Sequence, residues 1–166
     1  MLSGPPVSKT VSPEQLLDRF QASPPRQRQT LLRQLLQRRQ ELAPLIQERL
    51  DSLDATEDDW AGGCLLQILV EVDSQAREDL LARYPEGWLA VASAAGIDYA
   101  PLQRHLLLQD FEAADRLTAS ALRQLAGPGA VGRGYVYFSE VAAMPAVDLE
   151  SLDRLWLAYS RGRFGF

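Results

Sequence analysis

The chain has 166 residues, of which 46% are hydrophobic, so it is long enough to bury a core without disulfides or structural metal ions. Its net charge of -5 gives no broad positive field, which argues against nucleic acid or an anionic membrane as the main partner. A single cysteine, Cys64, excludes an internal disulfide and a cysteine-based metal cage, and we expect it to be a small buried hydrophobic residue.

The apolar runs of the chain are too short for a membrane protein. None reaches the roughly 18 residues that a membrane-spanning helix needs. Residues Met1 to Thr10 lack both the apolar core of a secretory signal and the Arg- and Ser-rich pattern of an organelle transit peptide. We therefore expect a mature cytoplasmic monomer without an integral membrane segment, and peripheral association with membranes stays open.

The first half of the chain shows helical periodicity, and helix-start residues mark its breaks. Ser12-Pro13 and Ser23-Pro24 each combine a cap residue with a proline, which predicts a helix after each pair. Pro44 predicts a break or a kink, since proline lacks the N–H that a helix interior uses. Short helices joined by short connections follow from these breaks.

Residues 60–72 are apolar on nearly every side, which predicts a central helix surrounded by others. Gly62 and Gly63 lower the helix propensity of this segment, so we expect them to allow close helix contact. Ser74 predicts the cap of a helix that ends at Tyr84, and residues 88–95 predict a short last helix. Residues 1–95 are therefore interpreted as one bundle of about five or six antiparallel helices.

A second unit is predicted over residues 97–166. Asp98 and Asp110 each predict the start of a helix, and the second helix is expected to close at Ala126-Gly127, which makes a helical hairpin. The following glycine-rich residues 127–137 predict a loop in which helical order stops.

Helix formation is predicted to resume after this loop. Ser139 is expected to cap a short turn that ends at Met144, and Asp148 to cap a final helix that buries Trp156 and Tyr159. The fold class is therefore all-α throughout.

Residues 127–132 satisfy the spacing G-x-G-x-x-G, but a helix rather than a strand is predicted before them, so we interpret the match as accidental. His105 is the only histidine and lacks companion ligands. Asp148, Glu150 and Asp153 are typical of a helix start rather than of a cation site. Since no nucleophile has a recognisable base partner, we expect no catalytic residues, no metal site and no prosthetic group.

An aromatic stretch follows the glycine-rich residues. Val131, Tyr135, Val136, Tyr137 and Phe138 would lie in water if this segment were only a loop. Two interpretations stay open. The side chains fold back on their own domain, or they form a hydrophobic surface for a flat ligand or a partner helix.

The second unit resembles the "genomes uncoupled" porphyrin-binding family, and the residues before it resemble the helical extension of cyanobacterial members. The last block of residues is the most specific. The residues that carry the resemblance are Asp98-Tyr99 with Leu102, Phe111, Ala114-Asp115, Pro145, Asp148-Leu149, Asp153-Arg154-Leu155-Trp156 and Tyr159 to Phe166.

The resemblance implies a non-catalytic activator and carrier. Such a protein binds protoporphyrin and magnesium-protoporphyrin and stimulates the large subunit of magnesium chelatase in chlorophyll biosynthesis, a step of photosynthetic metabolism. Family members have a cupped site with apolar walls and with cationic hydrogen-bond donors for the two propionates of the porphyrin. The resemblance places the contacts to the porphyrin ring at Val131, Tyr135, Val136, Phe138 and Val141. It places a contact to one propionate at Arg133.

Family members continue past the block that ends at Phe166, so the sequence predicts a porphyrin-binding domain that is cut and a site that is incomplete. Phe164 and Phe166 are then expected to be exposed. The alternative function is a helical scaffold that binds only proteins, which the paired amphipathic helices would also allow.

Overall fold

The computed structural model describes residues 10–166, which form helices joined by turns and loops, with no strand in this part of the chain. The predicted all-α fold is confirmed. No helix in the described range is long and apolar enough to cross a membrane. We expect no secretory signal and no transit peptide in residues 1–10. Of these, residues 1–9 lie outside the described residues.

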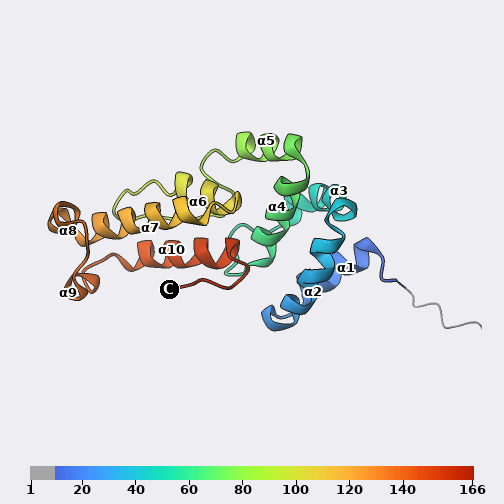
Figure 1. The fold of residues 1–166 in the computed structure, drawn as a ribbon, viewed down its shortest axis with the longest axis horizontal. Helices are drawn as coiled ribbons and strands as arrows, with labels where there is room; N and C mark the ends of the chain where they lie inside the picture. The colour runs from blue at the N-terminus through green and yellow to red at the C-terminus, as the bar shows by residue number, and fades with distance from the viewer. Residues whose placement is uncertain (1–9) are drawn as a thin grey trace, which may run out of the picture.

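Figure 1 shows the helices in two groups, with α8 and α9 at one end of the molecule and α1 and α2 near the other. The first group comprises α1 (Pro13–Ala22), α2 (Pro25–Gln37), α3 (Arg39–Arg49), the short η1 (Leu50–Ser52), α4 (Ala61–Val72) and α5 (Ser74–Arg83). The second comprises α6 (Ala100–Leu107), α7 (Phe111–Ala126), α8 (Pro128–Arg133), α9 (Phe138–Val141) and α10 (Ala146–Tyr159).

Local cap chemistry sets several helix starts as predicted. The amide of Gln15 donates to Ser12 Oγ at 3.1 Å, and the Gln15 side chain accepts in return from the Ser12 amide at 3.2 Å. The carboxylate of Asp110 accepts from the amide of Ala113 at 3.2 Å at the start of α7. These bonds satisfy amides that have no partner in the first turn of a helix.

Three predicted caps are wrong by one residue. Tyr99, not Asp98, precedes α6, although the Asp98 carboxylate accepts from the amide of Ala100 at 2.9 Å. Pro24, not Ser23, precedes α2, because Pro25 takes the first helical position and keeps the residue before it extended. Ser23 Oγ instead donates to the carbonyl of Arg19 at 2.5 Å. Asp73, not Ser74, caps α5, and its carboxylate accepts from the amide of Ala76 at 3.0 Å.

The sequence predicts a break or a kink at Pro44, and the break does not occur, because α3 continues through this residue. The chain leaves helical geometry at Arg38 instead, where φ is -106° and ψ is 17°. Leu42 and Ile46 are buried on either side of Pro44. Their packing keeps the helix together although proline removes one hydrogen bond from it.

Helix α4 takes part in both hydrophobic clusters of the described chain. Leu65 and Ile68 pack in the cluster with α1, α2 and α3, whereas Leu66 and Val70 pack in the cluster that includes α6, α7 and α10. The predicted central helix is confirmed. The boundary predicted between residues 95 and 97 stays a prediction.

The predicted close helix contact is confirmed at Gly63, whereas Gly62 lies against a side chain of the irregular segment that follows α5. A Cβ atom at Gly63 would lie 2.3 Å from the carbonyl oxygen of Ala158 in α10, and one at Gly62 would lie 2.6 Å from the Trp88 ring. Cys64, the next residue, is fully buried, as expected. Glycine therefore sets the distance between α4 and α10.

The helix predicted over residues 88–95 does not form. The segment is irregular and lies along α10, where Ser151 Oγ donates to the carbonyl of Ala92 at 2.6 Å and Arg154 donates to that of Ala90 at 2.6 Å. Side chains of α10 therefore provide hydrogen bonds that a helix would have made internally.

Asp148 holds the same segment and is not the cap of α10, which begins at Ala146. Its fully buried carboxylate accepts hydrogen bonds from Ser93 Oγ, from the amide of Ala94 at 2.9 Å and from Tyr99 Oη at 2.8 Å. Burial raises the pKa of Asp148, but the hydrogen bonds together outweigh burial and leave the pKa below its ordinary value.

Candidate functional site

The segment between α7 and α10 is more ordered than the loop that its glycines predict. Helix α8 forms within it, because Gly127 with φ of 107° makes the turn after α7 and Pro128 takes the first helical position. Gly134 with φ of 85° ends this helix. The prediction of a continuous loop over residues 127–137 is therefore wrong for residues 128–133.

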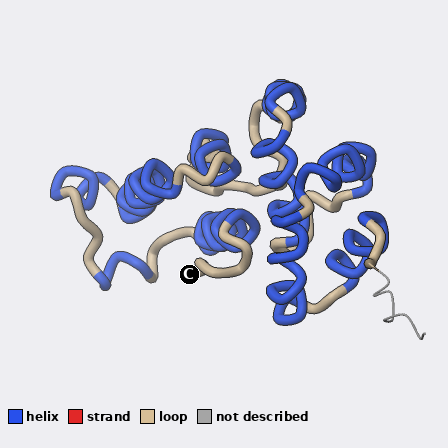
Figure 2. Tube along the Cα trace, turned by 45° about the vertical axis from the view of Figure 1, so that its right-hand side comes forward, coloured by secondary structure: helices blue, strands red, loops and turns tan. Residues whose placement is uncertain are grey.

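Helix α9 begins at Phe138, so the predicted cap at Ser139 is wrong as well. The Glu140 carboxylate instead accepts from the amide of Tyr137, at 2.8 Å. Figure 2 shows that α8 and α9 remain at one extremity of the molecule when the view is turned.

The residues of the aromatic stretch differ in their exposure, so folding back on the domain applies to only part of it. Val136 is partly buried against the cluster formed with α7 and α10. Phe138 is 94% exposed, and four of its neighbours are also exposed, namely Val131, Tyr135, Tyr137 and Val141. We call the predicted site residues, Val131, Arg133, Tyr135, Val136, Phe138 and Val141, the α8–α9 face.

Arg133 is the cation of this face and is paired with Glu140. Its Nη2 lies 2.7 Å from Oε1 and 2.8 Å from Oε2 of that carboxylate. The guanidinium carbon lies 4.1 Å from the ring centre of Tyr137 and 5.5 Å from that of Tyr135. The two tyrosine rings meet edge to face at 5.4 Å, so the arginine is held by one carboxylate and two aromatic faces.

This pairing changes the acid–base properties of both partners. The hydrogen bond from the Tyr137 amide, followed by the one from Arg133, lowers the pKa of Glu140. The hydrogen bond to Glu140 raises the pKa of Arg133. The face therefore carries a fixed cation and a fixed anion at neutral pH.

A second aromatic area lies at the other end of α7. Trp156 stacks on Phe111 with ring centres 6.1 Å apart, and Phe164 packs edge-on against both rings. Phe164 and Phe166 are exposed, as predicted, around an open hollow of about 340 Å³. The charged side chain in its lining is Asp115, so this hollow lacks a cation for an acidic ligand.

Trp156 and Tyr159 are buried in the core, as predicted. The indole Nε1 of Trp156 donates to Thr118 Oγ1 at 2.9 Å, which fixes α10 against α7. The patterns of apolar residues in these two helices did not reveal this bond.

The other chemical candidates have structural roles. His105 Nδ1 lies 3.1 Å from the Asp110 carboxylate at the start of α7. The described residues contain no group of three or more His, Cys, Asp and Glu side chains that could hold a metal ion. The exposed large apolar side chains, in contrast, include those of the α8–α9 face and those of Phe164 and Phe166.

Comparison with known proteins shows which family the second part of the chain resembles. Residues 92–166 match the model of the GUN4-like family. A Ycf53-like protein of Synechocystis sp. is 46% identical over 107 residues, which cover 64% of this chain and 46% of that protein. An uncharacterized ycf53 protein of Pyropia yezoensis is 32% identical over 130 residues, which cover 75% of this chain and 53% of that protein.

A chloroplastic tetrapyrrole-binding protein of Arabidopsis thaliana is 48% identical over 65 residues, which cover 39% of this chain and 24% of that protein. The chain spans about half the length of the first two relatives. Their matches are longer than the family segment, so they also include part of the helical region before it. Residues 92–166 of the chain belong to the GUN4-like family.

Proposed function

We propose that this protein binds protoporphyrin and magnesium-protoporphyrin at the α8–α9 face. The observation that carries the proposal is the gathering of exposed aromatic and aliphatic side chains around one arginine within the family segment. The name of the Arabidopsis relative, a tetrapyrrole-binding protein, supports the same ligand class.

The chemistry of this face suits such a ligand. A porphyrin offers a wide apolar ring, which Phe138 and Val141 can cover, and two propionates that need cationic donors. Arg133 is the cation of the face. Glu140 occupies Nη2 of this guanidinium, so a propionate can accept from its other N–H groups or exchange with that carboxylate at Nη2.

The protein acts in our proposal as a non-catalytic regulator in the cytoplasm. Protoporphyrin is the substrate of magnesium insertion and magnesium-protoporphyrin is its product, so a carrier of both is placed to regulate that reaction. We propose stimulation of the large subunit of magnesium chelatase in chlorophyll biosynthesis, by a monomer of this protein.

A titration of the 166-residue chain with protoporphyrin tests the ligand assignment. We expect a saturable shift of the porphyrin Soret band together with quenching of tyrosine and tryptophan fluorescence. The full-length Synechocystis relative serves as the comparison. If that relative binds and this chain shows no saturable response, the α8–α9 face is not sufficient to bind the porphyrin.

Magnesium insertion tests the regulatory part separately. Adding the chain to a magnesium chelatase assay should raise the initial rate at limiting protoporphyrin. A chain that binds porphyrin without changing this rate contradicts the regulatory proposal. If the chain does not bind porphyrin but binds proteins through residues 12–95, the result supports the alternative function, a helical scaffold that binds only proteins.

A further inference from the structure

A hollow lies on α2 at the point where the residues after α10 contact this helix. Gln29 Nε2 donates to the carbonyl of Arg161 at 2.7 Å, which holds these residues on α2. The hollow has a volume of about 400 Å³, and its α2 residues share one helix face because they are three and four positions apart. We call it the arginine groove, with a lining that includes Gln29, Leu32, Arg33 and Leu36 of α2, Arg39 of α3 and Arg163.

The sequence around this groove carries only positive charge. Residues 19–40 contain six arginines and no aspartate or glutamate, although the whole chain has a net charge of -5. Arg28 is buried and paired with Asp59. Arg33 and Arg163 are exposed, and they take part in none of the ion pairs formed within residues 10–166. Two arginines of the groove are therefore available to anionic groups.

The groove also has an apolar part. Leu32 is buried and Leu36 is partly buried, and both pack in the cluster of the first group of helices. Arg39 contributes less charge, because its Nη1 donates to the carbonyl of Leu36 at 2.9 Å and its Nε lies 3.8 Å from the Glu71 carboxylate. No aspartate or glutamate lines the groove, so its lining combines leucines with unopposed cations.

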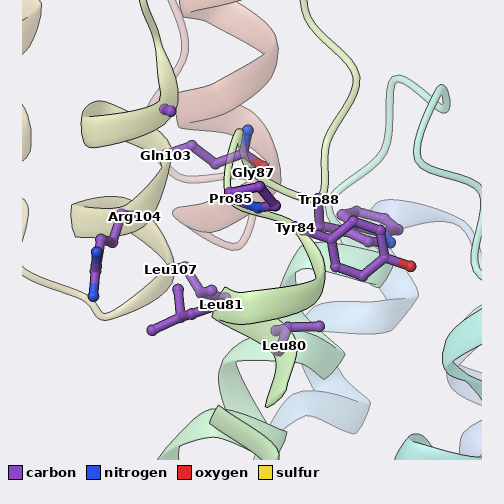
Figure 3. Close-up of a pocket in the computed structure, with 10 residues that line it drawn as sticks. Leu80, Leu81, Tyr84, Pro85, Gly87, Trp88, Gln103, Arg104 and Leu107 are labelled. Atoms are coloured by element: carbon purple, nitrogen blue, oxygen red, sulfur yellow. The ribbon is translucent and has the colours of Figure 1, made fainter. Parts of the chain in front are cut away.

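The cavity between α5 and α6 lacks this combination (Figure 3). Its volume is about 150 Å³, and the figure shows the Arg104 side chain pointing away from the Gln103 amide. The buried Gln103 side chain accepts from the Leu89 amide at 2.6 Å and donates to the Leu89 carbonyl at 3.2 Å. These bonds hold the segment after α5 against α6, so we interpret that cavity as space between packed elements.

We infer that the arginine groove binds an acidic amphipathic helix of a partner protein. The apolar stripe of the partner packs on Leu32 and Leu36, and its carboxylates accept from Arg33 and Arg163. An amphipathic helix presents carboxylates on both sides of its apolar stripe, so the two arginines bind separate carboxylates. Because α2 and the residues after α10 both line the groove, the partner links the first group of helices to the family segment.

The observations favour a protein segment over a membrane. A hollow of about 400 Å³ takes up side chains, whereas a flat bilayer surface does not enter it. The net charge of -5 also opposes the approach of the whole chain to an anionic membrane.

A peptide of leucine and glutamate, about 14 residues long and patterned as an amphipathic helix, is the probe. Its counterpart has glutamine in place of each glutamate. In fluorescence anisotropy titrations with the 166-residue chain, the glutamate peptide should bind saturably and the glutamine peptide about tenfold more weakly. Arg33→Gln and Arg163→Gln should each weaken binding of the glutamate peptide about threefold, and both together about tenfold. Arg33→Lys should restore part of the loss.

Arg77→Gln is the matched control, since Arg77 is exposed on α5 and also takes part in none of the ion pairs of the described residues. It should leave binding of the glutamate peptide unchanged. The inference is overturned if this peptide does not bind saturably, if the glutamine peptide binds equally well, or if Arg33→Gln and Arg77→Gln have equal effects.

Two further measurements test the other occupants. Binding of the chain to vesicles of phosphatidylglycerol and phosphatidylcholine, lost in Arg33→Gln, would assign the groove to a membrane and overturn the inference. A dimer that Arg33→Gln dissociates in analytical ultracentrifugation would assign it to a second copy of the chain, with the same consequence. We expect neither. Because none of these experiments contains a porphyrin, their outcome is independent of the proposed function.

Discussion

Glu140 holds Arg133 with both of its carboxylate oxygens, at 2.7 and 2.8 Å, and so links α9 to α8. The same carboxylate accepts from the amide of Tyr137 at 2.8 Å. An acidic side chain of the protein thereby occupies donors that a ligand carboxylate would use. In the binding mode that we propose, Glu140 therefore competes with a porphyrin propionate for Nη2 of Arg133.

Replacing Glu140→Gln should therefore increase the affinity for protoporphyrin. The amide oxygen can still accept from Tyr137, whereas the charge that competes for Arg133 is lost. We expect about a threefold gain, since an exposed ion pair contributes little. Protoporphyrin dimethyl ester, which has no free propionate, should bind both proteins equally in Soret titrations.

Glu112→Gln is the control for this substitution, because Glu112 accepts from Arg116 at 2.6 Å on the exposed surface of α7. It should leave both affinities unchanged. Weaker protoporphyrin binding by Glu140→Gln, or an equal gain for the ester, would show that Glu140 does not compete with the ligand.

Gly63→Ala should destabilise the fold. A methyl group at this position would lie 2.3 Å from the carbonyl oxygen of Ala158, so α4 and α10 would have to separate. We expect a loss of about 1–3 kcal/mol in the free energy of unfolding, measured with urea. Gly132→Ala in α8 meets no atom within 4 Å and should be neutral or stabilising by about 0.5–1 kcal/mol. Equal stability of the two variants would contradict the close contact.

Asp148→Asn should loosen the irregular segment that lies along α10. An amide cannot accept from Ser93, Tyr99 and the backbone amides as a carboxylate does, so we expect a loss of about 1–3 kcal/mol at pH 7. The pKa of Asp148 is lower in the folded state than its ordinary value. Its contribution is therefore complete above that ordinary value, near about pH 4, and is lost as the pH falls through the folded pKa.

The measurement is the free energy of unfolding of both proteins between pH 7 and pH 3. The difference between them should shrink as the solution becomes acidic. Asp115→Asn, at an exposed carboxylate on α7, is the matched control and should cost little at any pH. A difference that grows at low pH would reverse the sign and refute the role of the Asp148 carboxylate.

Cys64 should be unreactive in the folded protein. Burial raises the pKa of its thiol to about 12, and nearby Arg161 and Arg28 offset this only in part. At pH 8 we expect no reaction with Ellman's reagent until urea unfolds the chain, and then one thiol per molecule. Rapid reaction without urea would show that α4 is accessible.

Helices with local signals were predictable from the sequence. Ser12 and Asp110 each accept a hydrogen bond from the amide three residues later, so both partners of each cap are close in the sequence. Residues 88–95 have helical spacing as well, but Ser151 and Arg154 of a distant helix decide their structure. Short-range patterns do not contain that contact.

The same limit applies to the candidate site. The aromatic residues of the α8–α9 face were visible as an apolar run, but the glycines around them hid α8 and nothing in the spacing paired Arg133 with Glu140.

Protoporphyrin titration of two serine variants tests the central claim most directly. Phe138 and Phe166 are both strongly exposed phenylalanines, so neither substitution should disturb the core, and they belong to the two separate aromatic areas. If the α8–α9 face binds the porphyrin ring, Phe138→Ser weakens binding by about tenfold, the effect of losing one aromatic contact, and Phe166→Ser leaves it unchanged. Unchanged binding by Phe138→Ser with loss in Phe166→Ser would contradict the claim and place the ligand beside Trp156.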